Sequence, residues 1–287
     1  MPTKDVRIII CSDVGNEVDD QFAIVHALLI PRLEVCGTIA NFYRGANSVI
    51  KAEQKLVEIS RLSGKQGDYP IVQGALDPLG ASKVTGAELI VKTALSESSK
   101  PLYILCMAGL TDVALALRLA PQIAERMTVI WVGGGRYPQG SHEANLARDR
   151  EAANEVMGSD CPVWQIPSGA YKQMQVSIPW LNWQLQDAGR LGDYLTRGVA
   201  RFIDQHDQDT MWINRDVWVL GDSAAVGVLL DEQKGNYVEK QAPYFQENWT
   251  YDLKRYRDKR KIRVYQRLNS VMIVNDLIAR LHLVVPL

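Results

Sequence analysis

Four carboxylates follow the first apolar segment of this chain. Residues 6–11 are rich in β-branched side chains, and Asp13, Glu17, Asp19 and Asp20 come directly after them, where an apolar helical pattern begins. Open α/β folds carry their sites at the carboxyl ends of the strands, so these side chains are expected at that edge of a sheet. Carboxylates this close repel one another unless water or a cation lies between them. The cluster therefore indicates a hard divalent cation, and Ca²⁺ is favoured.

A solvated acidic loop is the alternative reading of the same segment. Aspartate and glutamate stabilise a helix N-terminus through its dipole without binding any metal. Gly15 and Asn16 favour a sharp turn, which would let several oxygens converge on one point. Both readings stay open on this segment alone.

The composition describes a chain that can bury a full hydrophobic core. It has 287 residues, of which 47% are hydrophobic, and a net charge of −1. No linker, low-complexity tract or internal repeat interrupts it, so we expect one domain over residues 1–287. The near-neutral charge argues against a nucleic-acid partner. The basic residues of 254–263 alternate with Tyr256 and Val264, which favours a solvated hairpin over a phosphate-binding patch.

The cysteines and the apolar runs indicate where in the cell the protein is expected. Cys11, Cys36, Cys106 and Cys161 show no C-x-x-C spacing, so neither a zinc site nor a redox pair is indicated. Buried free thiols of a reducing compartment are expected instead. The first apolar run is too short for a signal peptide, and no run approaches transmembrane length. We therefore expect a soluble, cytoplasmic protein with no membrane partner.

Strand and helix patterns alternate through the first part of the chain. Strands are expected over residues 6–11, 33–39, 71–72, 102–107, 129–133 and 163–166, and helices over 20–29, 47–63, 86–95, 112–118, 121–126 and 150–157. This alternation predicts an α/β fold with a mostly parallel central sheet and helices on both faces. Beyond about residue 175 we expect helices over 178–186, 190–204, 223–230 and 270–281, with a hairpin of 249–256 and 261–267.

Polar residues also follow the later strands of the predicted sheet. Each alone is explained by a turn or by a helix N-cap. Their common place at the carboxyl edge is what favours a shared site. These residues are Asn41, Thr111, Asp112, Ser141, Glu143, Asn145, Asp149 and Asp222.

Five segments, taken in order, resemble the motifs of the inosine/uridine-preferring nucleoside hydrolase superfamily. The family's D-x-D-x-x-x-D-D is similar to C-S-D-V-G-N-E-V-D-D at 11–20, and its G-P-L-T-N to A-G-L-T-D at 108–112. Its M-G-G is similar to V-G-G at 132–134, its E-F-N-x-x-x-D-P-E-A-A to E-A-N-L-A-R-D-R-E-A-A at 143–153, and its H-D-P-x-A to G-D-S-A-A at 221–225. The ordered set spans nearly the whole chain. It implies hydrolysis of the N-glycosidic bond of a ribonucleoside to free base and ribose.

The resemblance also implies roles for individual residues. Ca²⁺ would be held by the carboxylates of Asp13, Asp20 and Asp222 and by the backbone carbonyl of Thr111; with a water and two vicinal ribose hydroxyls this makes about eight oxygens, a number that Ca²⁺ accepts. Asp13 would also be the general base for the attacking water. The residues that would hold the ribose hydroxyls are Asp19, Asn41, Glu143 and Asn145. Family members commonly form homo-oligomers, so a dimer or tetramer is expected.

The chain departs from the family pattern in three places. Cys11 replaces the first aspartate, and two extra residues within 14–18 give a G-N-E-x-D-D turn, as in a divergent branch of the superfamily, through which Glu17 could reach the site. Gly221 stands where many members have a histidine that protonates the leaving base. Protonation must then come from elsewhere, and the candidates are His206, Trp212 and Trp218. For the two tryptophans, helix packing is the alternative.

Two other functions remain open at this stage. A protein that binds Ca²⁺ and ribose but has lost turnover is credible because of Gly221. An unrelated α/β phosphatase is the other alternative. Phosphate chemistry would need a cation near the carboxylates, and residues 12–42 offer only Arg32, at the end of a predicted helix. Hydrolysis of a nucleoside is the favoured prediction.

Overall fold

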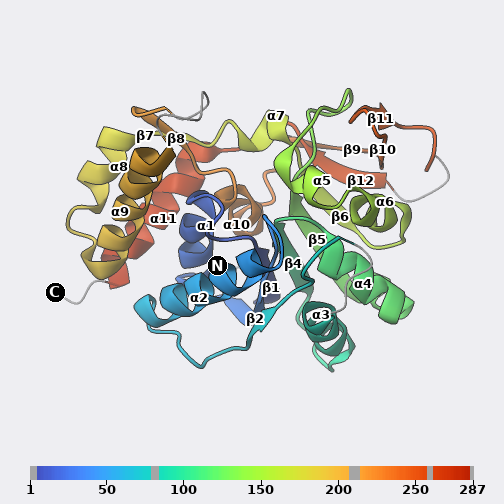
Figure 1. The fold of residues 1–287 in the computed structure, drawn as a ribbon, viewed down its shortest axis with the longest axis horizontal. Coiled ribbons are helices and arrows are strands. Elements are labelled where there is room, and N and C mark those ends of the chain that lie inside the picture. The colour runs from blue at the N-terminus through green and yellow to red at the C-terminus, as the bar shows by residue number, and fades with distance from the viewer. Residues whose placement is uncertain (1–4, 79–83, 207–213, 257–260, 285–287) are drawn as a thin grey trace.

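Eight strands form a central sheet in the computed structural model, which describes residues 5–78, 84–206, 214–256 and 261–284 (Figure 1). Their order across the sheet is β3-β2-β1-β4-β5-β6-β12-β9. The strands are β1 (Val6–Ser12), β2 (Leu33–Ala40), β3 (Ile71–Gln73), β4 (Leu102–Met107), β5 (Met127–Val132), β6 (Val163–Ile166), β9 (Tyr237–Gln241) and β12 (Lys261–Tyr265). Within this sheet β9 and β12 pair antiparallel, and the other neighbours are parallel. The predicted mostly parallel sheet is confirmed.

Helices cover both faces of the sheet, as predicted. One face carries α1 (Asp19–Leu28), α2 (Asn47–Leu62) and α10 (Ser223–Leu230); the other carries α3 (Thr85–Leu95), α4 (Thr111–Leu119) and α6 (Arg150–Gly158). Because successive side chains of a strand point to opposite faces, β1 contributes to two cores. Ile8 and Ile10 pack with the first set of helices, and Ile9 and Cys11 pack with the second.

The order of the strands reverses at β1, and this positions the site. The chain runs outward from β1 through β2 to β3, and then returns to place β4 on the other side of β1. In open α/β sheets, a crevice forms where the connections from two neighbouring strands run in opposite directions along the sheet. It lies at the carboxyl ends of those two strands. The turn after β1 and the start of α4 therefore meet at one edge of the sheet.

A helical layer lies beside the first core. Figure 1 shows α8 (Ile178–Leu185), α9 (Gly189–His206) and α11 (Ser270–Val284) gathered next to α1, and these three helices contact one another. The remaining elements are short: η1 (Pro121–Arg126), α5 (Ala144–Arg148), α7 (Ser168–Tyr171), the pair β7 (Gln175–Ser177) and β8 (Val217–Val219), and the pair β10 (Tyr244–Phe245) and β11 (Tyr251–Asp252). Among the described helices, none combines the length and apolar character needed to cross a bilayer.

The predicted hairpin of 249–256 with 261–267 is wrong. β12 pairs antiparallel with β9 and in parallel with β6, whereas β11 pairs with β10. Ile262 and Val264 are buried on the sheet, so this strand needs partners on the central sheet rather than a local hairpin partner. Arg263 is only partly exposed: its guanidinium lies 4.2 Å from the ring centroid of Trp164 and makes an ion pair with Glu232 at 3.0 Å.

Candidate active site

The turn after β1 brings the first carboxylates together. Gly15 has a φ of +105°, and the amide of Asn16 donates to the carbonyl of Asp13 at 3.1 Å, which closes the turn. The hydroxyl of Ser12 donates to Oδ1 of Asp20 at 2.5 Å. Helix α1 begins at Asp19, so Asp19 and Asp20 both lie in its first turn, where the helix dipole favours negative charge.

Three carboxylates from two distant segments meet at this edge. Ligand oxygens of Asp19, Asp20 and Asp222 all lie within 4.8 Å of one another. Asp222 precedes α10, which packs on α1, and its amide donates to Oδ2 of Asp19 at 3.2 Å. The sequence predicted Asp13, Asp20 and Asp222 as the metal carboxylates; the structure groups Asp19 with the last two.

Burial and mutual repulsion act on all three side chains. Burial raises the pKa of Asp20 and Asp222 well above the usual range, and it raises that of Asp19 to about 6. Repulsion from neighbouring carboxylates is a second cause of these raised pKa values. A divalent cation would offset both effects, since hard oxygen donors are the ligands that Ca²⁺ prefers. The donor set therefore fits a hard metal ion.

Asp13 lies in the same cavity but faces a different partner. Its Oδ2 lies 3.5 Å from Nε of Arg148, the last residue of α5, and neither atom has a hydrogen-bond partner among the described residues. Burial raises the pKa of Asp13 to about 7, while the guanidinium of Arg148 opposes that rise. Sequence reasoning missed Arg148, although its place beside Asp149 in the E-x-N motif was a usable signal.

Asn41 is held in a defined orientation by Asp112. Its Nδ2 donates to Oδ2 of Asp112 at 2.7 Å, and the amide of Ala75 donates to the other carboxylate oxygen at 3.1 Å. The amide oxygen of Asn41 is then left buried and unpartnered within the described chain. Burial raises the pKa of Asp112 to about 7, against these hydrogen bonds. Gly74 and Gly86 make room for the carboxylate, because a Cβ on either would lie within 2.4 Å of its oxygens.

Glu143 and Asn145 lie where the chain enters α5. The Glu143 carboxylate caps this helix and accepts from the amides of Asn145 and Leu146 at 3.2 and 2.9 Å. It also accepts from the amide of Gly134 at 2.7 Å and from the hydroxyl of Tyr171 at 3.0 Å. The side chain of Asn145 donates to the carbonyl of Val132 at 2.8 Å, so it is anchored to the end of β5.

These groups line a cavity of about 60 Å³. It contains six of the predicted residues, namely Asp13, Asp19, Asp20, Glu143, Asn145 and Asp222, together with Asn16, Glu17, Met107, Val132, Ala144 and Tyr171. The expectation that Glu17 could reach the site agrees with its place here; burial and the nearby Asp19 raise its pKa to about 7. Tyr171 was missed, although its position just after β6 satisfies the carboxyl-edge rule.

Four predicted residues do not line this cavity. Asn41 lies beside it, with its amide bonded to the carbonyl of Ser12. Thr111 begins α4, and its hydroxyl donates to Oδ2 of Asp149 at 2.8 Å. His206 and Trp218 are the other two, and Trp212 lies outside the described residues.

His206 lines an adjoining cavity of about 270 Å³. This cavity and the carboxylate cavity share Asn16 as a wall. The His206 ring stacks on Phe202, which also lines this cavity, with centroids 4.2 Å apart. Trp218 is 4% exposed and packs edge-on against Phe202, so it lies in the core behind this cavity.

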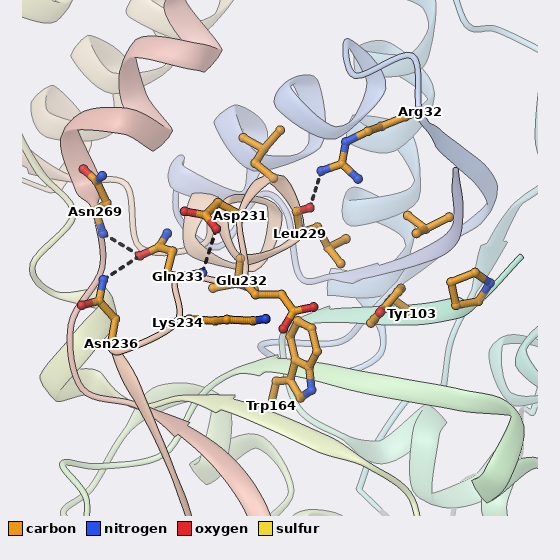
Figure 2. A pocket seen from close by; sticks show the side chains of 14 residues that line it. Arg32, Tyr103, Trp164, Leu229, Asp231, Glu232, Gln233, Lys234, Asn236 and Asn269 are labelled. Atoms are coloured by element: carbon orange, nitrogen blue, oxygen red, sulfur yellow. Dashed lines mark hydrogen bonds between the residues drawn. The ribbon is translucent and has the colours of Figure 1, made fainter. Parts of the chain in front are cut away.

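A larger cavity, of about 780 Å³, lies at the opposite edge of the sheet (Figure 2). It is bordered by Val6, Tyr103 and Trp164, which are near the amino ends of β1, β4 and β6. Figure 2 shows Gln233 fixed there by Asn236 and Asn269. None of the predicted site residues lines it.

Comparison with known proteins decides the family. Residues 8–270 match the family model of the inosine-uridine preferring nucleoside hydrolases. The chain belongs to this family. The pyrimidine-specific ribonucleoside hydrolase RihA of Salmonella agona is 31% identical over 238 residues, which cover 71% of this chain and 73% of that enzyme. As a nucleoside hydrolase, the chain belongs with enzymes that act on the N-glycosidic bond, as its motifs predicted.

Solved nucleoside hydrolases share the fold. The purine-preferring ribonucleoside hydrolase of Gardnerella vaginalis superposes with a TM-score of 0.82 over 96% of this chain and 98% of that one, at 18% identity. An inosine-guanosine nucleoside hydrolase superposes with a TM-score of 0.78 over 98% and 99% of the two chains, also at 18% identity. The bases named for these proteins and for RihA differ, so the family assignment leaves the base preference open.

Proposed function

We propose that this nucleoside hydrolase uses Ca²⁺ to cleave the N-glycosidic bond of a ribonucleoside, releasing free base and ribose. The observation that supports this most directly is the cluster of Asp19, Asp20 and Asp222 beside Asp13. Four acids in one cavity, of which only Asp19 is partly exposed, are unfavourable for stability, and a bound cation would account for them. Asp13, Asp20, Asp222 and the carbonyl of Thr111 would hold it, with Asp19 bordering the same space.

Asp13 is proposed as the general base. Asp13 borders the cavity, and its buried Oδ2 has no hydrogen-bond partner among the described residues, so it is free to accept a proton from a water in that space. When bound, Ca²⁺ would acidify the attacking water and bind two vicinal ribose hydroxyls. The proton of that water would pass to Asp13 as the sugar becomes cationic.

Asn41, Glu143 and Asn145, with Asp19, are proposed to position the sugar. Asp112 turns the amide of Asn41 so that its oxygen is the free acceptor. Acceptors of this kind bind a hydroxyl more tightly as positive charge grows on the sugar, so they lower the barrier as well as bind. The helix cap that fixes Glu143 limits its motion, which favours a preorganised site.

A panel of ribosides tests this function. Nitrophenyl riboside has a leaving group that needs no proton, so we expect clear hydrolysis in the presence of Ca²⁺. Natural nucleosides should be slower by about 10²–10⁴-fold, because Gly221 supplies no acid. If His206 protonates the base from the adjoining cavity, His206→Ala will slow the hydrolysis of inosine or uridine. The rate of hydrolysis of the nitrophenyl riboside will be unchanged. Absence of cleavage of every riboside would reject hydrolysis.

A binding protein without turnover is the second candidate, and Arg148 is the observation that favours it. Its guanidinium lies against Asp13, the proposed base, at 3.5 Å. An ion pair of this kind lowers the basicity of a carboxylate. Calorimetry with Ca²⁺ and ribose, in a preparation that cleaves no riboside of the panel, would establish this alternative.

We also propose that the enzyme is cytoplasmic and forms a homo-oligomer, either a dimer or a tetramer. The support is the resemblance to a family whose members commonly assemble in this way. Light scattering on purified protein would measure the mass, which is 32.1 kDa for one chain. A monomer at all concentrations would reject the assembly.

A further inference from the structure

Tyr171 fills the space that a side chain at position 221 would need. A Cβ built on Gly221 would lie 2.9 Å from Cδ2 of Tyr171 and 3.3 Å from Oδ2 of Asp19. Real Cβ atoms do not approach an aromatic carbon this closely, so Gly221 is required by the neighbouring ring. The short helix α7, which follows β6 directly, delivers this ring to the carboxylate cavity.

The hydroxyl of Tyr171 occupies the last free acceptor position of Glu143. Each carboxylate oxygen of Glu143 accepts two hydrogen bonds: Oε2 from the amides of Gly134 and Leu146, and Oε1 from the amide of Asn145 and from Tyr171. A carboxylate has about four lone-pair directions, so no position is left for a sugar hydroxyl. Three of the four donors are backbone amides, which prevent the carboxylate from turning.

Tyr171 borders the cavity, and its phenol oxygen, which donates to Glu143, keeps an acceptor lone pair. Burial and the contact with Glu143 raise its pKa, so the phenol keeps its proton and Glu143 keeps its donor. We propose that Tyr171 is a substrate-binding residue of this site: its oxygen accepts a hydrogen bond from one sugar hydroxyl that Glu143 cannot receive directly. This rests on the proposed function, and it replaces the direct contact between Glu143 and the sugar with one through Tyr171.

A cycle between an enzyme variant and substrate analogues tests the contact. Tyr171→Phe keeps the ring against Gly221 and removes only the hydroxyl. Wild type and variant are compared on nitrophenyl riboside and on three analogues that each lack one sugar hydroxyl. Both kcat/KM and the dissociation constant from calorimetry are measured, so the cycle also applies to a protein that binds without turnover. Tyr265→Phe is the matched control, since Tyr265 is buried and its hydroxyl donates to the carbonyl of Glu232, away from this cavity.

We expect Tyr171→Phe to weaken binding of the full riboside and to lower its kcat/KM, each by about tenfold, which corresponds to the loss of one hydrogen bond. For one analogue only, the variant and wild type should be equal, because the lost hydroxyl and the lost phenol belong to the same contact. Tyr265→Phe should change nothing. Gly221→Ala, which forces the ring of Tyr171 to shift, should weaken the same contact selectively and serves if Tyr171→Phe does not fold.

Two results would overturn the proposal. One is that Tyr171→Phe has the same kcat/KM and dissociation constant as wild type. The other is a loss of the same size on every analogue, which is what a general structural defect gives. Failure of the proposed function has a different signature, because wild type would then neither cleave nor bind any riboside with Ca²⁺ present. In that case the contact with Tyr171 is rejected along with it.

Discussion

Asp13 experiences two opposing influences. Burial raises its pKa to about 7, and the guanidinium of Arg148 at 3.5 Å lowers it. A base whose pKa lies near the working pH combines a useful ionised fraction with good proton affinity. Burial, the guanidinium of Arg148 and the charge of the proposed Ca²⁺ together therefore determine how readily Asp13 accepts a proton.

Asp13→Asn keeps the shape of the side chain and removes its charge. We expect kcat/KM on nitrophenyl riboside to fall by about 10²–10⁴-fold, the usual contribution of a general base. Initial rates at saturating Ca²⁺ measure the effect. Asp68→Asn is the control and should retain full activity, because Asp68 is exposed and pairs with Lys65. A variant at position 13 that keeps more than about a tenth of the wild-type value would contradict the assignment.

Gly86 of helix α3 packs against the carboxylate of Asp112, which orients Asn41. A Cβ on Gly86 would lie 2.4 Å from Oδ1 of Asp112 and 2.8 Å from Cγ2 of Ile39. Alanine normally stabilises a helix by about 1 kcal/mol relative to glycine. Overpacking against a buried carboxylate that accepts hydrogen bonds from Asn41 and Ala75 costs about 1–3 kcal/mol. This cost should exceed the gain in helix stability.

Gly86→Ala should therefore lower the free energy of unfolding by about 1–2 kcal/mol, measured by urea denaturation. Displacement of Asp112 would also release the amide of Asn41, and KM for the riboside should rise. An increase in stability would show that Asp112 moves without cost.

Helices α1 and α11 are joined by a polar pair between the buried His26 and the partly exposed Asp276. Nε2 of His26 lies 2.8 Å from Oδ2 of Asp276, and Nε of Arg280 donates to the same oxygen at 2.6 Å. Burial alone would raise the pKa of Asp276, but these hydrogen bonds lower it to about 2. Burial lowers the pKa of His26, so its imidazole is neutral at pH 7.

The loss of stability in Asp276→Asn should depend on pH. Because the folded pKa of Asp276, about 2, is below its ordinary value of 3.8, its contribution is complete above pH 4 and disappears as the pH falls toward 2. Urea unfolding at pH 7, 5 and 2.5 should give a wild-type advantage of about 1–3 kcal/mol at the two higher values and clearly less at the lowest. A constant difference would mean that the charge of Asp276 contributes nothing.

Some elements could be predicted from local sequence and others could not. β4, β6 and α10 have the predicted bounds, because each is an apolar run closed by turn-forming or capping residues. β12 was assigned to a local hairpin because alternation predicts a strand but does not identify its partner. Its neighbours β6 and β9 are set by the tertiary fold.

The same distinction applies to the site. Asp13, Asp20 and Asp222 follow strands or begin helices, so the carboxyl-edge rule found them. The contact of Tyr171 with Glu143 joins residues on separate segments, and the stacking of His206 on Phe202 directs it into an adjoining cavity. Both depend on side-chain packing, which periodicity does not encode.

At the scale of the whole molecule, the acidic cluster should couple metal binding to stability. Buried carboxylates that repel one another destabilise the metal-free protein. A ligand that binds only the folded state stabilises it, by about 2.7 kcal/mol at a hundred times its dissociation constant. We therefore expect the Tm to rise with added Ca²⁺ and to fall with a chelator.

Asp222→Asn separates the two effects. With one charge removed, the metal-free variant should melt at a higher temperature than metal-free wild type, while most of its response to Ca²⁺ is lost. Thermal unfolding followed by circular dichroism, with and without Ca²⁺, measures both quantities. If added Ca²⁺ did not change the Tm of the wild type, the proposed cation site would be rejected.

The amide of Asp222 bonds to Asp19 across 203 residues of sequence. At about 5–20 residues per second, the ribosome makes the second residue about 10–40 s after the first. During that interval the acids after β1 have emerged, but the carboxylate that completes their cluster has not been synthesised. We therefore expect the proposed cation affinity to appear only after Asp222 has been made, and to be absent from a nascent or truncated chain that ends before this residue.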